Sequence, residues 1–208
     1  MPYLVAFLVV LLIVVWAWLV VRRRARSRPK PLSLVLPAQF IVADIETTGL
    51  DPLKHEIIEI AAIRVNRDSD RHDTFTGLIK PKRKISAKIT SITGITNDLL
   101  QREGEPLEDV VIAFLDFIGD RPLVFYNAPF DISFLVLAAG RVSREINNPA
   151  TCALAAARQA WPGLPSYSLV NLCRMANCRT DGAHRALKDC ELTMQLYAAA
   201  ASVLGRAA

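Results

Sequence analysis

Four carboxylates stand in short polar motifs that could act together in one reaction. The motifs pair Asp44 with Glu46, Asn127 with Asp131, and His184 with Asp189. Asp44 and Glu46 end the apolar run 40–43, and residues two apart on a strand project from the same face. If folding gathers all four acids within about 4 to 6 Å, their repulsion and desolvation are unfavourable unless cations occupy the site. Such clusters select hard divalent cations, Mg²⁺ or Mn²⁺.

The order of these motifs resembles that of the DEDDh 3′–5′ exonucleases, a family named for four acidic residues and a histidine. The matching stretches are Asp44-Ile-Glu46-Thr-Thr-Gly, Asn127-Ala-Pro-Phe-Asp131 and His184-Arg-Ala-Leu-Lys-Asp189. Segments 93–98 and 164–173 extend the likeness, which covers about residues 38–200 and is strongest to the branch containing the proofreading subunit of bacterial DNA polymerase III. One motif alone is a weak signal, whereas three in order at domain-scale spacing are a strong one.

The resemblance implies two divalent cations and a role for each motif residue. Asp44 would bridge both ions, Glu46 and Asp189 would complete the ion that activates water, and Asp131 would act on the second ion. His184 would take the proton of that water, because an imidazole changes charge near neutral pH. His184 and Asp189 would stand about 140° apart on a continuous helix. We therefore expect the histidine on the preceding loop and the aspartate on the helix.

Further residues are expected to bind the substrate. By resemblance, the segment after Glu46 lies against the 3′-terminal nucleotide, and Asn127 lies near the scissile phosphate. Basic residues between 80 and 88 would track the phosphates of a single strand. The predicted substrate-binding residues are Thr47, Thr48, Gly49, Leu50, Asn127, Lys82, Arg83 and Lys84. Plainer interpretations are a turn at 47–50, a turn cap at Asn127 and a solvated loop around Lys82.

Other positions carry weaker expectations. Thr93 and Tyr126 stand where many members of the family have histidine, so the nucleotide pocket is expected to differ in stacking and polarity. His55 and His72 are interpreted as surface or satisfied histidines. The four cysteines show no zinc-ligand spacing and suit a reducing cytoplasm.

Apolar periodicity predicts strands followed by alternating strands and helices. The expected strands are 39–46, 57–67, 73–80 and 123–126, and the expected helices are 107–118, 132–139, 152–161, 168–175 and 185–204. Hairpin-linked strands followed by such alternation imply an α/β fold with a mixed sheet flanked by helices. The resemblance implies the ribonuclease H-like form, with five strands and helices on both faces.

The N-terminus predicts a membrane anchor. Residues 3–21 contain no charged side chain and are long enough to span a bilayer as a helix. Basic residues follow at once, so the positive-inside rule places the rest in the cytoplasm, by the bacterial inner membrane. We predict a signal-anchor helix over 3–21, a basic, proline-containing linker over 22–37 and the exonuclease domain over 38–204. A cleaved signal peptide and a buried core helix are the alternatives.

The charge distribution supports this division. The chain has 25 basic and 20 acidic residues, for a net charge of +5. Six of the basic residues lie within 22–30 and no acid precedes Asp44, so the remainder has 19 positive against 20 negative charges. The balance indicates a basic collar beside anionic lipid. It excludes a uniformly basic nucleic-acid-binding domain.

Together these features predict a metal-dependent 3′–5′ exonuclease on ends of single-stranded nucleic acid, with DNA favoured, tethered to the lipid bilayer. Alternatives are an oligoribonuclease-like RNA exonuclease and a non-catalytic nucleic-acid-binding scaffold at the membrane. A decayed enzyme would be expected to have lost at least one of the five catalytic positions, and all are present. The sequence ends at Ala208 with no tail for a polymerase, so we expect a freestanding enzyme. No protein partner is indicated.

Overall fold

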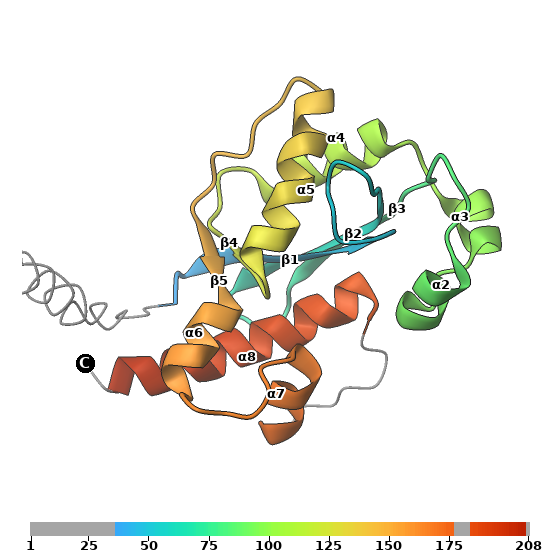
Figure 1. Ribbon diagram of the computed structural model, residues 1–208. Coiled ribbons are helices and arrows are strands. Elements are labelled where there is room, and N and C mark those ends of the chain that lie inside the picture. The colour runs from blue at the N-terminus through green and yellow to red at the C-terminus, as the bar shows by residue number, and fades with distance from the viewer. Residues whose placement is uncertain (1–35, 177–183, 207–208) are drawn as a thin grey trace, which may run out of the picture. The chain divides into compact units, whose positions relative to one another are not determined.

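A computed structural model describes residues 36–176 and 184–206. Its centre is a five-stranded sheet in the order β3-β2-β1-β4-β5 (Figure 1). The strands are β1 (Gln39–Thr47), β2 (Ile57–Asn66), β3 (Asp73–Leu78), β4 (Leu123–Phe125) and β5 (Ala150–Cys152). The first three strands pair antiparallel, whereas β4 runs parallel to β1 and β5 parallel to β4. The predicted mixed sheet of five strands is confirmed.

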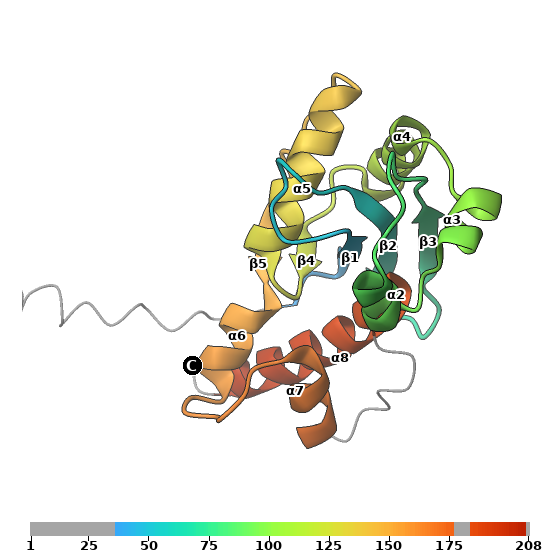
Figure 2. The same cartoon turned by 45° about the vertical axis from the view of Figure 1, so that its right-hand side comes forward.

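Helices cover both faces of this sheet. One face carries α4 (Leu107–Ile118) and α5 (Ala128–Arg141), and the other carries α6 (Ala153–Ala160), α7 (Leu169–Met175) and α8 (Ala186–Arg206). Two short helices, α2 (Ala87–Thr93) and α3 (Asn97–Glu103), stand beyond β3 (Figure 2). Both views place α2 beside the N-terminal end of α8.

The alternation of side chains along β1 decides which face receives the acids. Ile41, Ala43 and Ile45 pack with α4 and α5 in one buried cluster. Phe40 and Val42 pack with α6 and α8 in another. Because the pleat has a period of two, the even-numbered residues that follow continue toward α8. A register irregularity after residue 46 ends the regular pairing with β2.

The sequence patterns missed three elements. Neither α2 nor α3 was predicted, although the hydroxyl groups of Ser86 and Thr96 accept hydrogen bonds from backbone N–H groups at their first turns. Strand β5 is too short for a pattern of its own. Helix α5 begins at Ala128, four residues before the predicted start at 132, because Pro129 stands in its first turn, where a missing N–H is tolerated.

The predicted anchor over 3–21 and all but the last two residues of the predicted linker over 22–37 lie outside the described residues. Both stay predictions, as does the start of the domain at 38. Within 36–176 and 184–206, the helices are too short or too polar for any of them to cross a bilayer.

Candidate active site

Three of the predicted metal ligands meet where β1 approaches α8. Asp44 and Glu46 project from β1, and Asp189 stands in the first turn of α8. One carboxylate oxygen of each lies within 4.8 Å of those of the other two. The expectation that the pair on β1 acts as one unit, joined by the acid of the last motif, agrees with this geometry.

The fourth acid, Asp131, lies in the first turn of α5 and is only 3% exposed. The backbone N–H of Ile45 hydrogen-bonds to its carboxylate, which places Asp131 beside the strand that carries Asp44. The sequence had placed Asp131 just before a helix, whereas the structure includes it in one. The helix N-terminus favours a negative charge there.

Burial and mutual repulsion make this group of acids difficult to ionise. Burial raises the pKa of Asp44 well above its ordinary value, and the charges of Asp131 and Asp189 raise it further. Burial also raises the pKa of Glu46 to about 8 and that of Asp131 to about 8. The pKa of Asp189 is raised as well, again mainly by burial. Without added positive charge, the ionised forms of these side chains are therefore disfavoured.

The chain offers these acids little compensation of its own. In the part of the chain that the structure describes, no lysine or arginine forms an ion pair with any of the four. Hard divalent cations bind such unpaired oxygen donors, and their charge removes the repulsion. The residues therefore fit a divalent metal site, in the position that the sequence predicted.

His184 precedes α8 on a bend, with its side chain exposed. Its backbone φ is 70°, a left-handed conformation that histidine adopts more readily than most residues. Its N–H donates to Oδ1 of Asp189 at 3.2 Å, so the two residues are held together. The predicted division, histidine on the loop and aspartate on the helix, is found in the structure.

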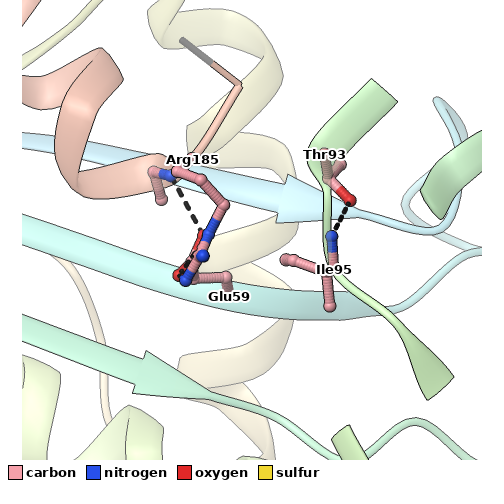
Figure 3. A network of polar contacts seen from close by, with 5 residues as sticks. Glu59, Thr93, Ile95 and Arg185 are labelled. Atoms are coloured by element: carbon pink, nitrogen blue, oxygen red, sulfur yellow. Dashed lines mark hydrogen bonds and ion pairs between the residues drawn. The ribbon is translucent and has the colours of Figure 1, made fainter. Parts of the chain in front are cut away.

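Sequence reasoning missed a fifth carboxylate beside this site. Glu59 on β2 stands opposite Glu46 in the strand register and is 2% exposed. It is bound by the guanidinium of Arg185, whose Nη2 donates to Oε1 at 2.7 Å and whose Nε lies 3.2 Å from Oε2 (Figure 3). The backbone N–H of Ala186 also donates to Oε2, at 3.0 Å. An acid inside the apolar run 57–63 was the signal available in the sequence.

The predicted nucleotide-binding segment forms a tightly bonded turn after β1. The hydroxyl of Thr47 donates to the carbonyl of Gly49 at 2.7 Å. Thr48 and Glu56 exchange two hydrogen bonds, from the N–H of Thr48 to the carbonyl of Glu56 and from the N–H of Glu56 to the hydroxyl of Thr48. The ring of His55 packs over Gly49 so closely that a Cβ there would lie 2.4 Å from Cε1. Leu50 is 83% exposed at the tip.

The predicted basic segment lies beside this turn. The N–H of Lys82 donates to the Glu56 carboxylate at 3.2 Å, and the side chains of Lys82 and His55 line one cleft. Lys82, Arg83 and Lys84 are exposed or partly exposed between β3 and α2. The structure thus brings Lys82 to the turn, and among the described residues none of the three basic side chains forms an ion pair with the four clustered acids.

The side chain of Asn127 differs in its hydrogen bonding from those of Thr93 and Tyr126, the two residues that depart from the family pattern. Asn127 is exposed at the start of α5 and makes no side-chain capping bond, so the plainer interpretation of it as a cap is not what the structure shows. Thr93 is buried, donates to the carbonyl of Ile89 and accepts from the N–H of Ile95. The hydroxyl of Tyr126 donates to the backbone carbonyl of Tyr167. Both hydroxyl groups are therefore occupied inside the protein.

Comparison with known sequences finds similar proteins over most of this chain. The sequence model of the exonuclease family matches residues 41–197. DNA polymerase III subunit epsilon of Aquifex aeolicus is 37% identical over 177 residues, which cover 83% of this chain and 86% of that protein. A PolC-type DNA polymerase III of Bacillus subtilis is 36% identical over 159 residues, 76% of this chain but 11% of that much longer protein.

Solved structures share the fold. Exonuclease I of Escherichia coli in complex with a dA16 oligonucleotide has a TM-score of 0.67 at 22% identity. The match covers 77% of this chain and 40% of the exonuclease I chain. Exonuclease X in complex with 5′ overhanging duplex DNA has a TM-score of 0.63 at 28% identity and covers 77% of this chain and 90% of its own. The likeness to exonuclease I is one of fold, which is ribonuclease H-like as expected.

Proposed function

Because this chain belongs to the exonuclease family, and is therefore a 3′–5′ exonuclease, we propose that single-stranded DNA is its substrate and that two divalent cations bind its acidic cluster. One observation carries the proposal: three carboxylates converge within 4.8 Å, and no lysine or arginine of the described chain forms an ion pair with them. A relative of nearly the same length is a DNA polymerase III subunit, and a structural neighbour was solved with a single-stranded oligodeoxynucleotide.

The cations would be held by Asp44, Glu46 and Asp189, with Asp131 completing the group. When bound, they acidify the attacking water and stabilise the negative charge that develops on the leaving oxygen. Mg²⁺ and Mn²⁺ suit an all-oxygen donor set. One neighbouring exonuclease I complex with single-stranded DNA holds zinc, so zinc belongs in any comparison of metals.

In hydrolysis the water oxygen forms a bond to the last phosphorus of the strand, the bond from phosphorus to the 3′ oxygen of the preceding nucleotide breaks, and that oxygen takes up a proton from solvent. His184 takes the proton of the water, because the residue is exposed, its backbone is bonded to Asp189, and an imidazole can pass that proton to solvent. The products are a nucleoside 5′-monophosphate and a strand shortened by one nucleotide with a free 3′-hydroxyl.

The substrate would lie across the turn that follows β1. Leu50, exposed at its tip, offers an apolar surface to the terminal base, while Thr47, Thr48 and Gly49 fix the turn on which it stands. Asn127, with no capping bond, is free to donate to the scissile phosphate. Lys82, Arg83 and Lys84 would neutralise phosphates further along the strand.

The decisive experiment follows 5′-end-labelled single-stranded DNA and RNA of one sequence with the full chain, in Mg²⁺, Mn²⁺, Zn²⁺ or EDTA. We expect a ladder that shortens from the 3′ end, faster on DNA, and no reaction in EDTA. An Asp44→Ala protein purified in parallel controls for contaminating nucleases. Faster loss of RNA would reassign the substrate, and binding of DNA without cleavage in any metal would favour a scaffold.

We further propose that residues 3–21 anchor the enzyme in a membrane and leave the domain in the cytoplasm, on the strength of the uncharged span and the basic residues after it. The full chain should sediment with membranes and stay there in high salt, whereas a chain that begins at Pro31 should be soluble and active. Release by salt alone would reduce the segment to a peripheral contact. A mature protein that begins after Val21 would establish a cleaved signal instead.

A further inference from the structure

We propose that Glu59 and Arg185 form a positioning pair that fastens the start of α8 to the sheet and so sets His184 and Asp189 for the reaction. Neither residue belongs to the acidic cluster, and neither needs to touch the substrate in this role. The inference rests on the proposed function, because it assigns the pair a part in that reaction.

Hydrogen bonds join Glu59 to the start of α8. Glu59 lies on β2 and Arg185 directly before α8, far apart in the sequence, and three nitrogen atoms converge on the one carboxylate. Two belong to the guanidinium and the third to the backbone of Ala186, the first residue of the helix. A bidentate contact of this kind fixes direction as well as distance. The helix start is therefore held in a defined orientation over the sheet.

The attachment of α8 to Glu59 also holds the two residues His184 and Asp189. Arg185 follows His184 directly, and four residues later Asp189 accepts the N–H of His184 at 3.2 Å. The helix bond from the N–H of Asp189 to the carbonyl of Arg185, at 3.0 Å, closes the same turn. Rotation or fraying of this turn would move the histidine and the metal-binding aspartate together. Misplacement by about 1 Å can cost a reaction on the order of 10²-fold.

The charges of Glu59 and Arg185 also act on the acidic cluster. Glu59 faces Glu46 across the register, and its negative charge is one of those that raise the pKa of the acids around the site. The charge of Arg185 acts in the opposite direction on Glu46. The pair thus adds almost no net charge to the metal site, although it contributes a carboxylate at its border.

The surroundings favour positioning over direct binding of the strand. The side chain of Glu59 is 3% exposed and that of Arg185 is 45% exposed, so solvent reaches only the arginine. Ile95, fully buried, packs in one apolar cluster with Ile58, the residue before Glu59 on β2. The donors of the guanidinium that point at Glu59 are already used.

The test compares Glu59→Gln, Arg185→Gln and the double variant in the full chain. Each single change breaks the same attachment, so we expect kcat to fall roughly 10- to 100-fold in each, with KM for DNA unchanged. The double variant should be no worse than either single one, because the second change removes nothing more. Arg144→Gln is the control, since the side chain of Arg144 is 46% exposed and pairs with Asp116, which does not belong to the acidic cluster.

Binding of Mn²⁺ by calorimetry, without nucleic acid, supplies a readout that does not depend on nuclease activity. Arg185→Gln removes a positive charge and Glu59→Gln a negative one, so Arg185→Gln should bind Mn²⁺ several-fold more tightly than Glu59→Gln. Both variants lose the bidentate contact and keep an acceptor for the N–H of Ala186, so the difference between them reports mainly charge. A merely structural pair would lower the unfolding temperature and leave kcat within twofold of wild type.

Three results would overturn the proposal: unchanged kcat in both single variants, additive losses in the double variant, or a raised KM in Arg185→Gln alone. The last would make Arg185 a direct contact of the strand. Glu59→Gln keeps an oxygen that accepts the N–H of Ala186, so it remains informative if Arg185→Gln does not fold. A wild-type chain that cleaves nothing would refute the proposed function, whereas the calorimetric difference would still test the pair.

Discussion

Two sets of carboxylates lie side by side in this protein, and the chain treats them in opposite ways: one is the single buried Glu59, and the other is the partly buried cluster of Asp44, Glu46 and Asp189. Glu59 is matched by a guanidinium and a backbone N–H of α8. Directly across the register, Glu46 joins Asp44 and Asp189 with no cation from the described chain in contact. Glu59 is 2% exposed and the acids of the cluster are partly buried, so both sets are withdrawn from most of the solvent, and the larger difference between them is one of partners.

The contrast separates structure from function. A buried carboxylate without a partner costs free energy, so a fold tolerates one only where a ligand brings the missing charge. Glu59 has its partners within the chain and therefore serves the fold around the site. The acids at the end of β1 are left for a divalent cation to bind. Position in the sheet alone would not have told the two apart.

The strongest way to break this comparison is to remove one acid from each set. Asp44→Ala should lose activity by at least about 10³-fold, because it removes a ligand of the cations that carry the reaction. Its metal-free stability should equal or exceed that of wild type, since a repulsive charge is gone. Glu59→Ala should instead lower the free energy of unfolding by about 1 to 3 kcal/mol, by leaving the N–H of Ala186 without a partner.

Cleavage assays measure the activity of both variants, and thermal unfolding in EDTA measures their metal-free stability. Nuclease activity of Asp44→Ala within tenfold of wild type would remove Asp44 from the metal site. A clear loss of metal-free stability in Asp44→Ala would mean that its carboxylate supports the fold as that of Glu59 does.

His184→Ala should have the next largest effect. General-base catalysis contributes about 10² to 10⁴-fold, and the remaining rate comes from water that the cations already acidify. We expect the rate of wild type to rise with pH through the neutral range and that of the variant to rise less. Initial rates between about pH 6 and 9 at saturating Mg²⁺ measure it. Identical pH profiles would show that another group takes the proton.

Gly49→Ala should have a smaller effect and extends the comparison to the substrate side. A Cβ at residue 49 would lie 2.4 Å from the His55 ring, so the ring or the turn must shift. We expect kcat/KM to fall roughly tenfold through displacement of Leu50, with the metal affinity unchanged. His55→Ala on the same chain should restore part of the loss. Gly140→Ala, where a Cβ meets nothing within 4 Å, is the matched control.

The sequence predicted the long elements and the motif residues better than the short helices. The start of β1 and both ends of α4 followed from long apolar patterns, and the residues of the acidic cluster followed from three motifs with a family resemblance. The helices α2 and α3 were missed because each has only seven residues, too few to establish a period of 3.6.

The partners of Glu59 could not be predicted, for a different physical reason. Its contact with Arg185 joins residues 126 apart in the sequence, and the packing of α8 against the sheet brings them together. An isolated acid in an apolar strand announces that a partner exists but not which one. The occupied hydroxyl groups of Thr93 and Tyr126 likewise depend on contacts that arise only on folding.

The most direct test of the central claim is the unfolding temperature of the full chain between about pH 5 and 8.5, in EDTA and in Mg²⁺. The folded-state pKa of Glu46 is raised from 4.5 to about 8, so the folded state binds more protons than the unfolded state across that window. Stability in EDTA should therefore be greatest at the acid end and fall as pH rises, by on the order of 5 °C. In Mg²⁺ the fall should disappear, because the cation replaces the protons. Parallel curves in EDTA and Mg²⁺ would contradict a metal site at these acids.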